Sequence, residues 1–105
     1  MDNYEKEFLK KYDSGHKFTE QEIRDALWDF YQVEETEHGH HRWTEDMRTI
    51  IIVCGRYFRI WWERGLTEYQ ENCYHNQPVE VIPHEYEKLI TVREWIEVKR
   101  EIQTF

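Results

Sequence analysis

The dipeptide Cys54-Gly55 stands between two β-rich runs, and it constrains the fold of this chain more than any other feature. A two-residue connection at such a point predicts an antiparallel hairpin with a defined register. We therefore expect one strand over residues 42–53 and another over residues 56–63. The predicted register pairs Val53 with Arg56, Ile52 with Tyr57, Ile51 with Phe58, Ile50 with Arg59, Thr49 with Ile60, Arg48 with Trp61 and Met47 with Trp62.

Side chains alternate along a strand, so this register sorts them into two faces. One face is mostly apolar and is predicted to join the core. The opposite face pairs Ile52 with Tyr57, Ile50 with Arg59 and Arg48 with Trp61, and it is amphipathic. We expect it either to be partly solvated or to contact another surface. A register slip by one residue would exchange the two faces.

Two helices are predicted before the first strand. Tyr4, Phe8 and Tyr12 recur at a spacing of four residues, and this apolar stripe predicts a helix over residues 2–13.

The second helix is predicted over residues 19–30, because Thr19 and Glu22 have the spacing of a capping box. One face of this helix is apolar, which predicts that it packs on a core. The face comprises Ile23, Ala26, Leu27 and Phe30.

Other segments read as strands or turns. Residues 31–36 alternate in polarity and predict a polar strand that ends in the histidine tract 38–41. Two prolines leave residues 75–84 as an irregular extended insert, since proline disfavours helix at the residue before it. Residues 67–72 are predicted to form one helical turn, and residues 89–98 form the last strand.

This order of elements predicts an α+β fold, with N-terminal helices packed on an antiparallel sheet of about four strands. A length of 105 residues predicts a single domain over residues 1–105. An exposed strand edge leaves a homo-oligomer open.

The composition favours a folded, acidic protein. Aromatic residues make up 16% of the chain. Disordered segments contain few aromatic residues, so this content predicts a folded chain. The 14 basic and 22 acidic residues give a net charge of −8. Because nucleic-acid affinity comes mainly from basic side chains on phosphates, we expect no direct nucleic-acid binding and favour a protein partner.

We expect a cytoplasmic protein that does not contact a membrane. The longest apolar run, residues 50–54, is far shorter than the ~20 residues of a membrane span. Residues 1–11 are charged throughout, so they do not read as a signal peptide. The two cysteines, without an export signal, favour a reducing compartment and no structural disulfide.

The histidines offer a possible metal site. His38, His40, His41 and His75 are the candidate ligands, since imidazole binds zinc, nickel and copper. A structural zinc site requires four ligands with paired spacings, which this sequence lacks. We interpret the tract as an exposed hairpin turn and predict no cofactor.

No constellation of side chains predicts an enzyme. Cys54 lies at a predicted tight turn, and Cys73 lies near His75. Sequence adjacency of Cys73 and His75 does not supply the nucleophile, base and orienting-group geometry that such catalysis requires. The acidic residues are abundant and fall mostly on predicted solvent faces. The chain has no glycine-rich phosphate loop and no hydrolase or metalloprotease motif. We therefore predict no catalytic residue.

Tyr57, Arg59 and Trp61 are the leading candidates for a binding surface, because Trp, Tyr and Arg are enriched at interface hot spots. Two alternatives stay open at this point: Trp61 completes a second small core under residues 66–84, or the segment stacks on single-stranded bases. The proposed surface also has an acidic rim, formed by Glu63, Glu68 and Glu71.

The string GRYFRIWWERGLTEYQEN over residues 55–72 is followed by QPVEV over 77–81 and TVREW over 91–95. Together these segments resemble a family of short uncharacterised proteins from phages, plasmids and conjugative elements of Gram-positive bacteria. The resemblance covers roughly residues 18–98, and it implies a mobile-element setting but no catalytic residue. It departs from the family pattern at residues 73–76.

Three functional hypotheses follow. The leading one is a small, acidic, non-enzymatic protein-interaction module of a mobile genetic element, with a host or element protein as partner. The alternative is an acidic protein that mimics the charge of a nucleic acid and inhibits a nucleic-acid-processing enzyme. It follows from the mobile-element setting, by analogy with inhibitors of CRISPR nucleases. A second alternative is a metal-binding domain that uses the histidine cluster.

Overall fold

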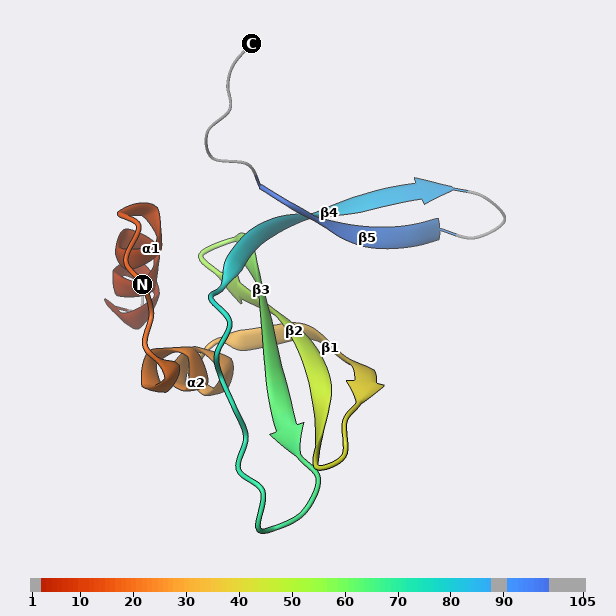
Figure 1. The fold of residues 1–105 in the computed structure, drawn as a ribbon. Helices are drawn as coiled ribbons and strands as arrows, with labels where there is room; N and C mark the ends of the chain where they lie inside the picture. The colour runs from red at the N-terminus through yellow and green to blue at the C-terminus, as the bar shows by residue number, and fades with distance from the viewer. Residues whose placement is uncertain (1–2, 88–90, 99–105) are drawn as a thin grey trace.

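The computed structural model describes residues 3–87 and 91–98. Within these ranges the elements are α1 Asn3–Asp13, α2 Glu20–Asp29, β1 Tyr31–His40, β2 Thr44–Val53, β3 Arg56–Gly65, β4 Val79–Glu87 and β5 Thr91–Glu97. The strands form one antiparallel sheet in the order β1-β2-β3-β4-β5. The sheet is curled, and the β4–β5 hairpin crosses the direction of β2 and β3 (Figure 1). The predicted α+β class is confirmed, but the number of strands is five rather than about four.

The central hairpin has the predicted register at every predicted pair, from Val53 opposite Arg56 to Met47 opposite Trp62. Cys54 and Gly55 have φ angles of 50° and 81°. Positive φ at both central positions is the conformation of a type I′ turn, whose twist matches the twist of the flanking strands. The turn therefore fixes the register, and the register fixes which side chains share a face.

Both predicted helices are present. The Thr19 hydroxyl accepts from the Glu22 N–H at 3.1 Å, and the Thr19 N–H donates to Glu22 Oε1 at 2.9 Å. This reciprocal pair is the capping box that the sequence predicted, and α2 begins directly after it. None of the helices in the described ranges is long and apolar enough to cross a membrane.

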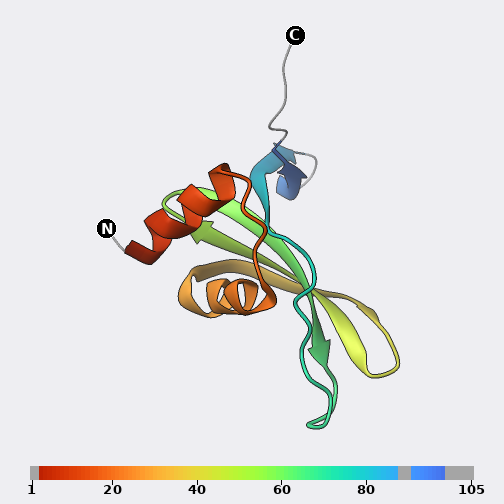
Figure 2. The same ribbon diagram turned by 60° about the vertical axis from the view of Figure 1, so that its left-hand side comes forward.

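The core lies between the helices and one face of the sheet, where both helices are seen in Figure 2. The Phe8 ring lies at its centre, with ring centroids 5.0 Å from Phe18, 5.3 Å from Phe30 and 5.1 Å from Phe58. Burying one such side chain stabilises a fold by about 1.5–3 kcal/mol. This aromatic cluster holds α1, α2 and the β2–β3 hairpin together.

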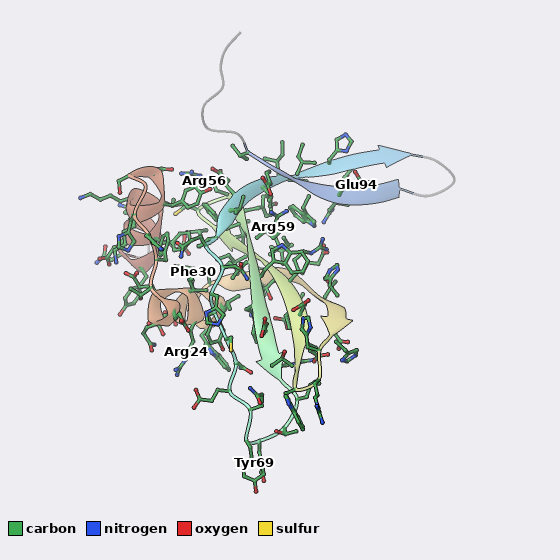
Figure 3. All side chains as sticks on the ribbon, viewed as in Figure 1. Arg24, Phe30, Arg56, Arg59, Tyr69 and Glu94 are labelled. Carbon is green, nitrogen blue, oxygen red and sulfur yellow. The ribbon has the colours of Figure 1, made fainter. Side chains whose placement is uncertain are left out.

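Arg56 adds a polar connection at the edge of this core (Figure 3). Its guanidinium donates two bonds to the Asp13 carboxylate, at 3.0 and 2.8 Å, and two to Glu80, both at 2.9 Å. These carboxylates, Asp13 first, hold the pKa of Arg56 above its usual range. The side chain thus joins the end of α1, the start of β3 and the start of β4.

The additional strand, β4, occupies much of the stretch that was predicted to be an irregular insert. Val79–Val81 pair with β3, whereas Val81–Glu87 pair with β5. The Val98 N–H donates to the Glu80 carbonyl at 2.8 Å, and ladder bonds recur at every second residue. The nitrogen of Pro83 therefore faces away from β5, on the side where β3 no longer pairs, so its missing N–H breaks no ladder bond.

Two other segments differ from the prediction, and part of a third lies outside the described residues. The histidine tract was expected to form a turn, but β1 continues through His40 and only His41 lies in the turn to β2. In the stretch 67–72, predicted as a helical turn, residues 67–70 form a hydrogen-bonded turn: the Gln70 N–H donates to the Thr67 carbonyl at 3.0 Å, and the Tyr69 N–H donates to Thr67 Oγ1 at 3.3 Å. The last strand begins at Thr91, and residues 89–90 lie outside the described ranges.

Candidate functional site

The candidate site is the face of the curled sheet opposite the helices. We call it the aromatic–arginine face and define it as Arg48, Tyr57, Arg59, Trp61 and Trp95. Strand alternation places the three β3 residues on one side, and the hairpin register puts Arg48 of β2 directly opposite Trp61. The predicted contact residues Tyr57, Arg59 and Trp61 thus share one half-buried face with Arg48, which the predicted register placed there but which was not named as a contact residue, and with Trp95, which was not predicted on this face.

Trp95 joins this face because the sheet curls. Its ring centroid lies 5.1 Å from that of Tyr57. Its Nε1 donates to Glu34 Oε1 at 2.9 Å, although Glu34 is on β1 and Trp95 is on β5, at opposite edges of the sheet. The two edge strands are therefore bridged across the concave side of the sheet by one side-chain contact.

Ion pairs hold both arginines in place. Arg48 Nη2 donates to Glu34 Oε2 at 2.7 Å, so Glu34 binds a guanidinium and an indole at the same time. Arg59 Nη2 donates to Glu97 of β5 at 2.6 Å. Arg59 lies between β3 and the β4–β5 hairpin in Figure 3. The side chains of Arg48 and Arg59 are 22% and 18% exposed, so they are ordered groups with access to solvent.

The hydrogen bonds of the two arginines are incomplete. Among the described residues, the buried side-chain nitrogen and oxygen atoms without a hydrogen-bond partner are Nε of Arg48 and Nε of Arg59. An unpaired buried donor costs free energy, so most such atoms in folded proteins are paired. Both atoms are buried within the aromatic–arginine face.

Trp61 and Trp62 are adjacent in sequence but have different surroundings. Trp62 Nε1 donates to the buried Thr49 hydroxyl at 3.0 Å, and its ring stacks on Tyr74 at 5.6 Å. The Trp61 ring lies 5.0 Å from the His38 ring on β1. The segment after β3 therefore packs its aromatic ring on Trp62, on the helix side, while Trp61 lies on the opposite side of the sheet.

The predicted acidic rim is spread over two elements. Glu63 is on β3, on the same side as Trp61, and its backbone pairs with that of Cys73. Glu68 and Glu71 are exposed and belong to the turn that follows β3, whose tip carries Tyr69 (Figure 3). The rim is thus at one end of the aromatic–arginine face rather than around it.

The four candidate histidines are not gathered into one group. His38 contacts Trp61, and His75 Nδ1 lies 3.4 Å from a Glu20 carboxylate oxygen. His40 and His41 each lie near two carboxylates, in the sets Glu37–His40–Glu45 and His41–Asp46–Glu63.

Those two sets have other pairings. Arg64 already donates to Glu45, and the two groups form an ion pair. His41 Nε2 lies 3.1 Å from Asp46 Oδ1 in an exposed contact. Each set offers three ligands at the rim of the sheet, one fewer than a structural zinc site requires.

The pKa values of both thiols are raised, which lowers their reactivity. A hydrogen bond from Cys54 Sγ to Glu5 Oε1, at 3.0 Å, raises the pKa of Cys54. Desolvation, with nearby carboxylates, raises the pKa of Cys73. Because the thiolate is the nucleophile, both side chains are protonated at neutral pH and poorly suited to covalent chemistry.

Sequence reasoning missed Arg48, Trp95 and Glu34 as members of the site. Arg48 could have been found, because the predicted register already placed it opposite Trp61. Trp95 and Glu34 depend on the curl of the sheet, for which the sequence has no local signal.

No protein-family model, curated protein or solved structure matches this chain. The resemblance to short proteins of mobile elements therefore stays a prediction, and the functional argument depends on the geometry of the molecule.

Proposed function

We propose that this chain is a small, non-enzymatic protein-interaction module that binds a protein partner through the aromatic–arginine face. The observation that carries the proposal is the composition of this face: two tryptophans, a tyrosine and two arginines lie together, half-buried, on the side of the sheet opposite the helices. Trp, Tyr and Arg are the residue types that dominate interface hot spots.

The way these side chains are held supports the same proposal. Glu34 and Glu97 hydrogen-bond the guanidinium groups of the two arginines. The Trp95 ring packs against the Tyr57 ring. A partner that docks on ordered side chains loses less conformational entropy than one that must order them.

A protein fits this face better than a nucleic acid does. The two arginines are each paired with a glutamate, so the face has no excess of positive charge. Affinity for a phosphate backbone requires such an excess. The net charge of −8 points in the same direction.

The test is differential capture from a nuclease-treated lysate of a Gram-positive bacterium, read by mass spectrometry. The baits are the wild type, Trp61→Ala and the matched control Trp28→Ala. Trp28 is 78% exposed on α2, on the helix side of the sheet. We expect one protein to be recovered by the wild type and by Trp28→Ala, but not by Trp61→Ala, while all three baits retain the same circular dichroism spectrum.

The salt response separates the leading proposal from charge mimicry. A partner bound by the aromatic–arginine face is retained when salt is raised. A partner that recognises the acidic surface is lost, because screening weakens interactions between exposed charges. If Trp61→Ala recovers the partner as well as the wild type does, the aromatic–arginine face is not the binding surface.

A further inference from the structure

The two helices are separated by a groove of about 150 Å³, which we call the interhelix groove. Its apolar lining includes Phe8, Phe18 and Phe30, which also belong to the hydrophobic core. The Tyr4 ring, 66% exposed, stands at its wall. The groove is therefore a shallow aromatic site on the helix side of the sheet, away from the aromatic–arginine face.

The rim of the groove is acidic. On α1 the lining positions are Tyr4, Glu7, Phe8 and Lys11, and on α2 they are Glu22, Asp25, Ala26 and Asp29. Both sets have the spacing i, i+3, i+4, i+7, so on each helix these side chains share the face that lines the groove. Four carboxylates and one ammonium group thus face each other across an aromatic floor.

The one cation does not neutralise this rim. Lys11 Nζ is bound to Glu22 at 2.8 Å and lies 3.9 Å from Glu7. Within the described residues, Asp25 accepts only from the neutral amide of Gln21, at 2.9 Å, and the Asp29 side chain makes no hydrogen bond or ion pair. Two carboxylates therefore border the groove without a cationic partner.

The position of Asp29 on α2 is unfavourable for the helix itself. Asp29 is its last residue, and the last turn contains no basic side chain. The C-terminal end of a helix carries partial negative charge, so an acid there destabilises the helix and a cation stabilises it. A binding role explains an aspartate at this position, whereas helix stability does not.

We propose that the interhelix groove binds an arginine or lysine side chain from a basic segment of a protein partner. The cation would lie between Asp25 and Asp29, and its aliphatic stem would cover the phenylalanine floor, since long basic side chains bury their stems on apolar surface. This inference uses a different surface from the proposed function, so either one can fail without the other.

The test uses the full chain and a fluorescein-labelled hexapeptide of alternating arginine and leucine. The matched peptide has citrulline in place of arginine, which keeps the shape and removes the charge. The protein variants are Asp25→Asn with Asp29→Asn, and the control pair Glu20→Gln with Glu94→Gln, which removes the same charge outside the groove. Fluorescence anisotropy measures affinity, and amide NMR shifts locate the bound peptide.

We expect the groove pair of substitutions to weaken arginine-peptide binding by at least about tenfold, and the control pair by less than about twofold. The citrulline peptide should bind at least about tenfold more weakly than the arginine peptide. The largest amide shifts should fall on Tyr4, Phe8, Ala26 and Phe30. The groove pair should also melt at the same temperature as the wild type or higher, because Asp29→Asn removes an acid from the last turn of α2.

Three results would overturn the inference. Equal weakening by the groove pair and the control pair would show that net charge alone attracts the peptide. Equal affinity of the citrulline peptide would show that no cation is recognised. Shifts confined to the turn that carries Glu68 and Glu71 would place the binding elsewhere.

Discussion

The Glu22 carboxylate connects the two helices and makes a pH-dependent contribution to stability. It accepts from Lys11 Nζ at 2.8 Å and from the Thr19 N–H at 2.9 Å, and His16 Nε2 lies 3.0 Å away. These contacts, with Lys11 the largest, lower the pKa of Glu22 from 4.5 to about 2. We predict that Glu22→Gln destabilises the protein at pH 7 and that the loss disappears in acid.

The magnitude follows from the pKa. A fall from 4.5 to about 2 is equivalent to about 3 kcal/mol of preference for the charged form in the folded state. The Glu22 side chain is 29% exposed, so solvent screening reduces the usable part to about 1–2 kcal/mol. Glutamine retains a capping-box acceptor, so the predicted loss comes from the charge and not from the cap.

The sign of the pH dependence follows from the direction of the shift. Because folding lowers the pKa, the stabilisation is complete above pH 4.5 and is lost as the pH falls from 4.5 toward 2. Urea unfolding at pH 7, 5 and 3, followed by tryptophan fluorescence, measures the difference between wild type and variant. Glu20→Gln, on the same helix, is the control. A loss that is equal at pH 7 and pH 3, or that Glu20→Gln reproduces, would refute this reasoning.

Three further predictions concern the supports of the fold. Arg56→Lys loses the paired bonds to two carboxylates and should lower the free energy of unfolding by about 1 kcal/mol, less in high salt, as measured by urea titration. Cys54→Asn favours the left-handed φ of the hairpin turn and should raise the urea midpoint by an amount equivalent to about 0.5 kcal/mol; a lower midpoint would contradict it. Gly65→Ala places a methyl group against the backbone carbonyl of Gln70. It should displace residues 66–72 at a cost of about 1–3 kcal/mol, and limited proteolysis should then cut within this turn; unchanged cleavage would count against it.

The parts of the fold that could be predicted have local signals. The Cys54-Gly55 turn defines the register of the central hairpin, and Thr19 with Glu22 defines the start of α2. In both cases a few neighbouring residues determine the geometry, so no knowledge of the remaining chain is needed. The shared face of Tyr57, Arg59 and Trp61 follows from the same register.

The parts that could not be predicted depend on distant contacts. β4 was predicted only as an extended insert, because its pairing is not local: Val79–Val81 pair with β3, and Val81–Glu87 pair with β5. Trp95 contacts Tyr57 and Glu34 only because the sheet curls, which brings β5 over the face of β1. A single sequence carries no local record of that curvature.

Photocrosslinking tests the central claim, that the aromatic–arginine face is the binding surface, most directly. The residue p-benzoylphenylalanine would replace Tyr57 in one bait and Trp28 in another, and both baits would be irradiated in a lysate of a Gram-positive bacterium. We predict that the bait labelled at position 57 crosslinks to one protein, which mass spectrometry identifies, and that the bait labelled at position 28 does not. Crosslinking of that protein from position 28 alone, or of no protein from position 57, would contradict the claim.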